Sequence, residues 1–309
     1  MELSQLEAFD RAARLGSFTN AAEELNLTQP SVSARIANLE TEVGGALFER
    51  RGRTLKLTPL GRQFLPYVER TLAVLTDGVQ AVENFHAGKS GQIVLGSLDN
   101  MATIMLPDPL ERFRDIYPAV DITIVVRRFQ EVLEGLYDGS GTLGLIGAPL
   151  FDKGIKILAH FQEPIYGVVA PEHPLAMLHE RQGYVTLSDV TEHTIFRVTL
   201  GPRATAFVRG AVEAARGSSG GSVVHVPWMM VIRMIILGQG VAFLPKSIVQ
   251  HHVERGKMIF LNVTDMPQLS NEPMIVSLRG RELDRPNQEF VRMVKNHWRH
   301  MLVYEDDES

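Results

Sequence analysis

The chain has 309 residues, of which 22% are charged and 45% hydrophobic, and its net charge is −5. This length is typical of two or more globular domains, and the acidic balance excludes a protein that is basic overall, so any nucleic-acid site must be a local basic patch. The sequence has no cysteine, which excludes disulfides, thiolate chemistry and cysteine-ligated zinc and suits a reducing cytosol.

The N-terminal stretch MELSQLEAFDRAARLG lacks a basic start followed by an apolar run, so we expect no signal peptide. The most apolar stretch, residues 226–245, is interrupted by Arg233, Gly238 and Gly240, which leaves it well short of the ~18 apolar residues of a membrane span. We therefore expect a cytoplasmic protein without a membrane segment, and a buried helix followed by a buried strand at 226–245.

Three helices are expected at the start of the chain, of which the second is short. The first has Ser4 and Glu7 in the arrangement of a capping box, and Gly16 is placed to end it. Thr19 can cap the second helix, whose paired alanines at 21–22 permit a close crossing with a neighbouring helix.

A third helix is expected from Thr28, which follows a tight turn at Asn26-Leu27 and can cap the helix. One face carries an apolar stripe, formed by Val32, Ile36, Leu39 and Val43. The second and third helices, joined by so brief a turn, are typical of a helix-turn-helix. The later of the two helices in that motif enters the DNA major groove with its N-terminus first.

The opening turns of this third helix carry small or hydrogen-bonding side chains in place of the usual Lys/Glu solvent face. Gln29 can read adenine bidentately and Arg35 can read guanine, whereas Ser31 and Ser33 can bond bases or phosphates. Ala34 is small enough for the backbone to approach the DNA. The alternative interpretation of these residues alone is a helical module for protein interaction.

A small two-stranded wing is expected in the stretch LFERRGRTLKLTPLG, residues 47–61, with the reversal at Arg51-Gly52. Residues 43–62 carry five Lys/Arg and one Asp/Glu, whereas residues 1–42 carry three and seven. The positive charge is therefore concentrated at the wing, whose arginines would lie against phosphates or in the minor groove. The basic residues of the wing are Arg50, Arg51, Arg53 and Lys56.

A long helix is expected from Thr58-Pro59 to about Phe85, and residues 86–91 would then form a hinge. Its apolar residues recur at fours and threes, as in a coiled-coil seam: Phe64, Val68, Leu72, Leu75, Val79 and Val82. A helix of this length spans roughly 40 Å. The seam needs a partner if the helix stands outside a compact domain, and the alternative is a helix packed on its own domain.

From Gln92 onward, strand-like and helix-like runs alternate, which is typical of an α/β fold with largely parallel sheets. The remaining length suits two lobes, with the chain crossing between them near 162 and again near 266. A final amphipathic helix is expected at 286–302, before an acidic tail at 304–309 that we expect to be disordered.

The stretch FTNAAEELNLTQPSVSARIANLETEVGGALFERRGRTLKLTPLGRQFLP resembles the N-terminal signature of LysR-type transcriptional regulators. The rest of the chain resembles the effector-binding domain of that family in IVLGSLDNMATIMLPDPLERFRDIYP, PEHPLA and GQGVAFLP. The resemblance spans nearly the whole chain, and its first part is highly specific.

The resemblance implies three parts. Residues 1–58 would form an all-α winged helix-turn-helix, and residues 59–88 the linker helix, which mediates dimerisation, with its hinge. Residues 89–309 would form a two-lobed α/β effector-binding domain like that of periplasmic binding proteins. Lobe I would comprise about 91–162 and 267–303, and lobe II about 163–266.

The function implied by the resemblance is sequence-specific regulation of transcription, modulated by a small-molecule effector bound between the two lobes. The implied partners are double-stranded DNA with an interrupted palindrome, the effector, RNA polymerase and further copies of the chain. Those copies would form a homodimer through the linker helix and a homotetramer as a dimer of dimers.

By position, the resemblance assigns DNA contact to Thr28, Gln29, Pro30, Ser31, Ser33, Arg35 and Arg53. The family often has Arg or Gln where Ala34 stands, so Arg35 is expected to take over part of that role. The family also commonly has Asp where Thr142 stands, and we expect a local structural adjustment there. No catalytic residue, cofactor or metal is expected.

In the implied cleft, the loop from Ser97 to Asn100 opens a helix, and helix N-termini favour anions. Asp99 would oppose an anion and favour a cationic or neutral ligand if it faces the cleft. If Asp99 caps the helix, which is the commoner role for such a residue, this argument fails. Arg203 could clamp a carboxylate. The other candidates for the cleft wall are Arg128, Phe129, Thr199 and Trp228.

Three motifs in the sequence resemble enzyme sites but lack the spacing or the structural context that such sites need. GSGTLG at 139–144 follows a helix and leads into a strand, the reverse of a dinucleotide site. His251-His252 lacks zinc spacing, and 217–222 lacks the spacing of a nucleophile elbow. An enzyme using the cleft is therefore disfavoured. A solute-binding protein of the same two-lobed fold would need a signal peptide and no DNA-binding head.

Overall fold

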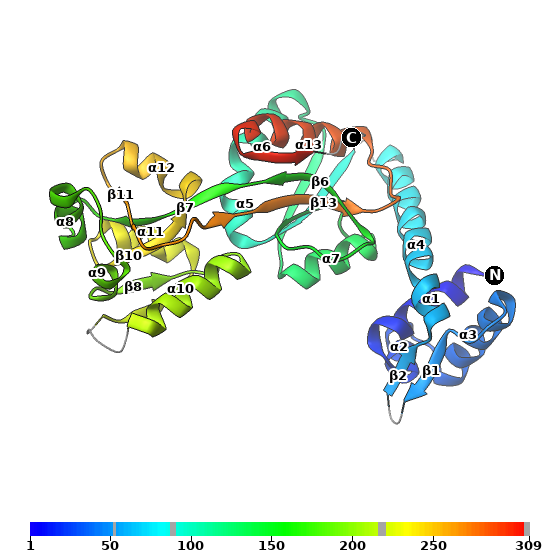
Figure 1. Cartoon of the computed structure of the whole chain (residues 1–309). Helices are drawn as coiled ribbons and strands as arrows, with labels where there is room; N and C mark the ends of the chain where they lie inside the picture. The colour runs from blue at the N-terminus through cyan, green and yellow to red at the C-terminus, as the bar shows by residue number, and fades with distance from the viewer. Residues whose placement is uncertain (52–53, 87–90, 216–220, 306–309) are drawn as a thin grey trace.

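The computed structural model describes residues 1–51, 54–86, 91–215 and 221–305, which form a head, a long helix and a two-lobed domain in chain order (Figure 1). The head lies at one end of the molecule, and the long helix leads from it to the nearer lobe. This architecture confirms the predicted fold class, a winged helix-turn-helix followed by a linker helix and an α/β domain of two lobes.

The head packs its helices around small side chains. Its elements are α1 (Leu3–Leu15), α2 (Phe18–Glu24), α3 (Gln29–Val43) and the antiparallel hairpin of β1 (Phe48–Arg51) and β2 (Thr54–Leu57). Ala21 and Ala22 are buried against Val32 and Ile36 of the α3 stripe, as expected for a close crossing. Asn26 turns the chain between α2 and α3 with a φ of 53°, in the left-handed region that asparagine tolerates.

Two of the expected helix caps are wrong. The cap of α1 is Glu2, whose backbone N–H donates to Gln5 Oε1 at 2.7 Å, so Ser4 lies inside the helix. Ser17 caps α2, because its Oγ accepts from the Asn20 N–H at 3.3 Å, and Thr19 is already helical. Each observed cap lies two residues before the expected one. Where several polar residues stand so close together, more than one of them can cap the helix.

Helix α4 (Pro59–His86) begins where its sequence predicts. Thr58 is the cap, and its Oγ1 accepts from the Gly61 N–H at 3.0 Å. A Cβ at Gly61 would collide with the Leu47 carbonyl oxygen, so the absence of a side chain lets the first turn of α4 lie directly against the start of the wing.

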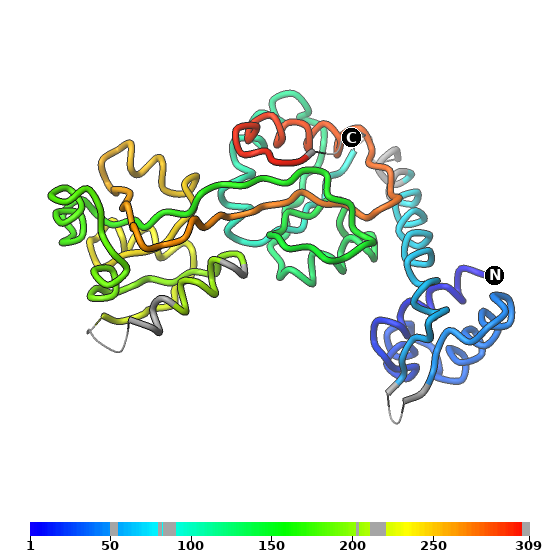
Figure 2. The backbone as a smooth tube through the Cα atoms, viewed as in Figure 1, coloured from blue at the N-terminus to red at the C-terminus, as the bar shows by residue number. Residues whose placement is uncertain are grey.

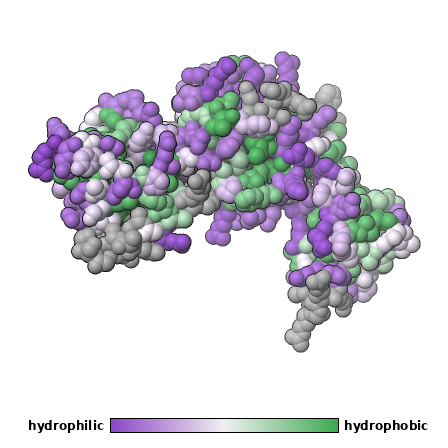
Figure 3. Space-filling view, in the orientation of Figure 1, coloured by the Kyte–Doolittle hydropathy of each residue, from purple (hydrophilic) through white to green (hydrophobic). Residues whose placement is uncertain are grey.

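The apolar seam of α4 has two different surroundings. Val68 is buried in the core of the head, and Phe64 packs beside it. Leu75, Val79 and Val82 stay exposed, by 46%, 55% and 56% of their surface. The helix therefore packs on its own domain along its first half and presents an apolar face along its second half. Figure 3 shows further hydrophobic surface, in green, on the visible side of the head and the middle of the molecule.

Lobe I is built on a six-stranded sheet of order β14-β6-β13-β5-β3-β4. Its strands are β3 (Gln92–Ser97), β4 (Asp121–Val126), β5 (Leu143–Gly147), β6 (Ile155–Phe161), β13 (Pro273–Leu278) and β14 (Leu302–Glu305). Its helices are α5 (Asp99–Met105), α6 (Pro107–Ile116), α7 (Phe129–Tyr137), α13 (Arg285–His297) and the short 3-10 helix η1 (Arg299–Met301).

Lobe II is built on a second sheet of order β11-β7-β10-β8-β9, with β12 paired to β7. Its strands are β7 (Glu163–Val169), β8 (Ile195–Arg197), β9 (Val223–His225), β10 (Val241–Pro245), β11 (Ile259–Leu261) and β12 (Ser270–Asn271). Its helices are α8 (Pro174–Gln182), α9 (Leu187–Thr191), α10 (Pro202–Ala215), α11 (Trp228–Ile236) and α12 (Lys246–Glu254).

Both sheets are mixed, whereas the alternation of elements predicted largely parallel sheets. Strand β3 pairs in parallel with β4 and β5, and β8 pairs in parallel with β9 and β10. Strands β6, β7 and β13 run antiparallel to their neighbours. These are the strands that carry the chain from one lobe to the other and back, which explains the mixed pattern.

Two crossings join the lobes, and Figure 2 shows the two segments, in green and orange, side by side. The first runs from β6 into β7 at residues 161–163. The second runs from β12 into β13 at residues 271–273, beyond the expected position near 266, because Ser270 and Asn271 still pair with β7.

The C-terminal helix is shorter than expected. Helix α13 ends at His297, and the chain then turns through η1 into β14, which pairs antiparallel with β6. Trp298 fixes this turn, because its indole Nε1–H donates to the Met105 carbonyl at 2.9 Å. The prediction of one helix to residue 302 is therefore wrong. Tyr304 and Glu305 belong to the strand, and the rest of the acidic tail lies outside the described residues.

None of the helices in the described parts of the chain combines the length and the apolar character that crossing a bilayer would need.

Candidate DNA-binding surface and effector cleft

The opening of α3 is exposed and is capped by Thr28. Thr28 Oγ1 accepts from the Ser31 N–H at 3.4 Å and shares a second hydrogen bond with Ser31 Oγ at 2.8 Å. Gln29, Pro30 and Ala34 are exposed with these two residues, while Val32, Ile36 and Leu39 of the apolar stripe are buried on the opposite face. The helix therefore presents a small, polar surface at its N-terminus.

Ser33 and Arg35 lie deeper than the other predicted contacts, because both are half-buried. The Arg35 guanidinium reaches back toward α1, where Nη1 makes a weak hydrogen bond to the Ser4 carbonyl at 3.5 Å. Ala34 between them is exposed, so at this position a methyl group, and no cation, faces outward. To reach a base edge, Arg35 would have to give up its contact with α1.

The wing is present, but its basic side chains are only partly described. Arg50 and Arg51 lie on β1, and their side chains, with the whole of Arg53, lie outside the described residues. Lys56 is exposed on β2, directly opposite Glu49 in the strand register. The structure therefore positions the wing backbone beside α3 and leaves the arginine contacts as predictions.

Sequence reasoning missed Glu40, which joins α3 to the wing. Its Oε1 accepts from the backbone N–H groups of Leu47 and Phe48, at 2.7 and 3.2 Å. A carboxylate acceptor makes these hydrogen bonds charge-assisted. The side chain thereby ties the C-terminal part of α3 to the first residues of the wing. A glutamate on a helix face gives no sequence signal for such a role, because its partners come from a later loop.

In lobe I, where the resemblance implies one side of the cleft, the helix after β3 starts differently from the capping hypothesis. Leu98 occupies the cap position of α5, and Asp99 is the first helical residue, exposed and without a cap hydrogen bond. The expectation that Asp99 caps the helix is therefore wrong. Ser97 is fully buried and donates from Oγ to the Leu98 carbonyl at 3.0 Å, so it shapes the loop. Asn100 follows on α5, half-buried.

Two further lobe I candidates have different surroundings. Arg128 is exposed at the start of α7, where its backbone N–H donates to Glu131 Oε2 at 3.0 Å. Phe129 is half-buried and packs against a core cluster of lobe I that includes Val132 and Leu133. Arg128 is thus free to meet a ligand, whereas Phe129 has at least a structural role.

On the lobe II side, two candidates are brought together. The Trp228 indole Nε1–H donates to the Thr199 carbonyl at 3.1 Å. Arg203 lies on α10, and its side chain lies outside the described residues. Two residues after Thr199, a Cβ built on Gly201 would stand 4.0 Å from the carbonyl oxygen of Ala148 in lobe I. The loops after β5 and β8 therefore approach each other across the lobes, which brings Ala148 close to the candidates of lobe II.

Among the described residues, no group of three or more His, Asp or Glu side chains is arranged to hold a metal ion.

Comparison with known proteins decides the family. Residues 3–62 match the domain described as "Bacterial regulatory helix-turn-helix protein, lysR family", and residues 86–299 match the "LysR substrate binding domain". The chain belongs to the LysR family. Both matched domains coincide with parts described above, the head with its helix-turn-helix and the two-lobed domain.

Named relatives of this LysR-family chain are transcriptional regulators. It is 27% identical to the "HTH-type transcriptional regulator CbbR" of Rhodospirillum rubrum over 295 residues, 95% of each protein. It is 30% identical to a "Probable RuBisCO transcriptional regulator" of Cyanidioschyzon merolae over 183 residues, 58% of this chain and 60% of that protein. The chain thus spans only part of some curated relatives.

Solved structures share the fold. The LysR-family regulator HinK of Pseudomonas aeruginosa matches with a TM-score of 0.52 and 26% identity, over 96% of this chain and 98% of HinK. A full-length OxyR variant from the same organism has a TM-score of 0.58 and 20% identity, over 99% of both chains, which shows likeness of fold alone.

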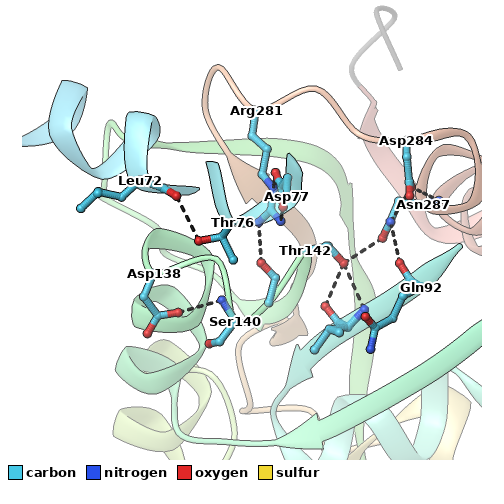
Figure 4. A network of polar contacts seen from close by, with 12 residues as sticks. Leu72, Thr76, Asp77, Gln92, Asp138, Ser140, Thr142, Arg281, Asp284 and Asn287 are labelled. Carbon is cyan, nitrogen blue, oxygen red and sulfur yellow. Dashed lines mark hydrogen bonds and ion pairs between the residues drawn. The ribbon is translucent and has the colours of Figure 1, made fainter. Parts of the chain in front are cut away.

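Thr142 departs from the aspartate that the LysR family commonly carries, and its surroundings are structural. Its Oγ1 accepts from the Val94 N–H at 3.1 Å and lies 2.9 Å from Asn287 Oδ1 and 3.0 Å from the Val94 carbonyl (Figure 4). A hydroxyl has one proton, so it can donate to only one of these two acceptors at a time. The threonine still joins β5, β3 and α13, as a local adjustment would.

Proposed function

We propose that this LysR-family chain is a sequence-specific transcription regulator, and not an enzyme, whose DNA binding is controlled by a small molecule held between the lobes. The observation that carries the proposal is the exposed, capped opening of α3, where small polar side chains stand beside a wing. Such a surface fits a major groove, because short side chains let the helix approach base edges. The transcriptional regulators among its relatives support the same interpretation.

The exposed half of α4 supports a homodimer. An open apolar groove on this helix and the start of α1 is lined by Leu3, Thr71, Val74, Leu75, Gly78, Val79 and Val82. A coiled-coil-like seam of this kind is covered when a second copy of the helix packs on it. We infer a dimer through α4, and from the family a homotetramer on an interrupted palindrome, with RNA polymerase as a further partner in the cytoplasm.

Ligand control follows from the two lobes. The candidates for ligand contact are Ser97, Asp99, Asn100, Arg128, Phe129, Thr199, Arg203 and Trp228, on loops and helix starts of both lobes. A ligand bound between them can shift the assembly only by its difference in affinity for two arrangements.

The test selects duplexes from a random DNA pool with the full chain and then compares variants on the selected duplex. We expect Ser33→Asp to lower affinity roughly 10- to 100-fold, because a carboxylate replaces a hydroxyl beside base edges and phosphates. Arg35→Ala should also weaken binding. Ser188→Asp, on an exposed serine of lobe II, is the matched control and should bind like the wild type. Unchanged binding by both α3 variants would overturn the assignment of α3.

A further inference from the structure

A buried arginine joins the linker helix to lobe I. Arg281 lies in the loop between β13 and α13 and is only 7% exposed. Its Nε donates to Asp77 Oδ2 of α4 at 2.7 Å, and its Nη2 contacts Asp77 Oδ1, so the pair is bidentate. Nη1 donates to the Gly141 carbonyl at 2.6 Å. Figure 4 shows Arg281 pointing toward Asp77. The one guanidinium therefore joins the linker helix to two loops of lobe I.

Close packing surrounds this ion pair on the same face of α4. Ala73 is fully buried in a lobe I cluster that contains Val132 and Leu136 of α7. A Cβ on Gly139 would stand 3.2 Å from Thr76 Cβ, which shows how closely that loop approaches the helix. This face is separate from the exposed valines of α4, so seating on lobe I and pairing with a second helix are compatible.

The same ion pair is connected to the strands that lead to the cleft. Gly141, which accepts from Arg281, directly precedes Thr142, and Thr142 bonds to Val94 in β3. Strands β3 and β5 then run in parallel from this end of lobe I to their C-terminal ends, where Ser97 and Ala148 lie in the two loops expected to border the effector cleft, here called the cleft loops. A continuous path of hydrogen bonds and paired strands thus joins the cleft loops to α4.

We propose that Arg281 is a positioning residue for DNA binding: with Asp77 it fixes the direction of the linker helix, and so of the head, relative to the effector domain. This inference rests on the proposed regulator function but concerns an intramolecular contact. Because the head packs on α4, a dimer through α4 itself sets the distance between its two heads; the contact with lobe I sets the direction of that pair of heads relative to the effector domains, and hence the spacing between the two dimers of a tetramer. It also makes that spacing sensitive to movements of the cleft loops.

The sequence allows a direct measurement, because the chain has no cysteine and two introduced cysteines are the only labelling sites. Ala37→Cys on α3 and Ala119→Cys in lobe I place labels on exposed alanines. Doubly labelled chains are diluted with unlabelled wild type, so that electron–electron distance measurements report distances within one chain. No DNA or ligand is needed, which separates this test from the test of DNA binding.

The variants are Asp77→Asn and Arg281→Met, with Glu289→Gln as the control. The control removes an exposed ion pair with Arg292 on α13, at an Nη2–Oε2 distance of 2.6 Å. We expect a narrow distance distribution for the wild type and the control, and a broader or displaced one for both variants. If Asp77→Asn keeps the wild-type distance distribution, and Arg281→Met, provided that it folds, keeps it too, the proposal is overturned.

DNA binding gives the second measurement. On the duplex selected by the wild type, both variants should lose roughly tenfold in affinity while their affinity for a single half-site stays unchanged. A purely structural role would lower both affinities together, because it would reduce the amount of folded protein, and that result would also contradict the proposal. If the wild type selects no duplex, the regulator function fails, and the distance measurement still decides the role of Arg281.

Discussion

Glu69 of the linker helix lies beside Arg14 of the first helix, with 3.9 Å between Arg14 Nη2 and Glu69 Oε1. Arg14 is more closely bound to Asp10, whose Oδ1 accepts from Arg14 Nε at 3.0 Å. Burial raises the pKa of Glu69 to about 7, Arg14 lowers it, and the carboxylates of Asp10 and Asp152 raise it further. One arginine of the head thus faces two carboxylates, Asp10 of the head and Glu69 of α4, where the head, α4 and lobe I meet.

This pKa predicts a stability that falls as pH rises. The native protein keeps the proton on Glu69 up to about pH 7, whereas the unfolded chain releases it near its usual pKa of 4.5. The protonated carboxyl therefore stabilises the native state fully below pH 4.5, and this contribution to the free energy of unfolding is lost as pH rises through 7. The loss is at most about 3 kcal/mol. In thermal unfolding, Glu69→Gln should gain over the wild type from pH 5 to pH 8. Glu111→Gln, on an exposed glutamate of α6, is the control. A constant difference across this range would contradict the assignment.

His173 predicts the opposite pH dependence in lobe II. Burial, with a smaller effect of the neighbouring His193, lowers its pKa to about 4. Its Nδ1 caps α8 by accepting from the Leu175 N–H at 3.2 Å, which requires the unprotonated nitrogen. The unfolded chain takes up a proton near pH 6.5, so stability is lost as pH falls from 6.5 through 4. Asparagine in His173→Asn can still cap the helix but does not titrate. When pH is lowered from 6.5 to 4, the unfolding temperature of this variant should therefore fall less than that of the wild type. Equal losses would count against a buried neutral histidine.

Removing Glu40 should loosen the wing. Glu40→Ala leaves the N–H groups of Leu47 and Phe48 without their charged acceptor, which costs about 1–3 kcal/mol. Hydrogen exchange of these two amides should accelerate, and DNA affinity should fall with it. Glu40→Gln retains an acceptor and should lie between the two proteins. Protection of both amides in Glu40→Ala equal to that in the wild type would rule out this role.

A charge on the apolar face of α4 should dissociate the dimer that we propose through this helix. Val79→Glu puts a carboxylate on a position that is 55% exposed in one chain and would be buried against a second. Sedimentation should show the wild type as a dimer or tetramer and the variant shifted to monomer. Val303→Glu, at a valine 58% exposed on β14, is the control. Unchanged assembly in Val79→Glu would exclude this face as the interface.

Asp99 should set the charge of the ligand, now that it is known not to cap α5. The full chain is screened by thermal unfolding against metabolites sorted by charge, where a ligand at a hundred times its Kd adds roughly 2.7 kcal/mol. We expect amines or neutral molecules to stabilise the wild type, and Asp99→Asn to weaken the amines. Asp115→Asn, on exposed α6, is the control. Stabilisation by carboxylates that Asp99→Asn leaves unchanged would show that Asp99 does not face the ligand.

The sequence by itself determined the elements whose signals lie within one or two turns of chain. Thr28 is the cap of α3, Thr58 starts α4, and paired alanines mark the close crossing in the head. Such signals are local, because a cap and its N–H groups are only three residues apart. Where two polar residues compete within one turn, as Ser17 and Thr19 do, the sequence predicts the helix but not its first residue.

The tertiary structure decided what depends on partners far along the chain. Strand β14 forms only because β6 offers it a free edge, and the same pairing ends α13 at His297. The sheets became mixed because strands must cross between the lobes and return. Arg281 and Asp77 are 204 residues apart, so neither has a local pattern that reveals the other. Burial and ion pairing depend on which side chains the fold brings together, and those partners are absent from any single stretch of sequence.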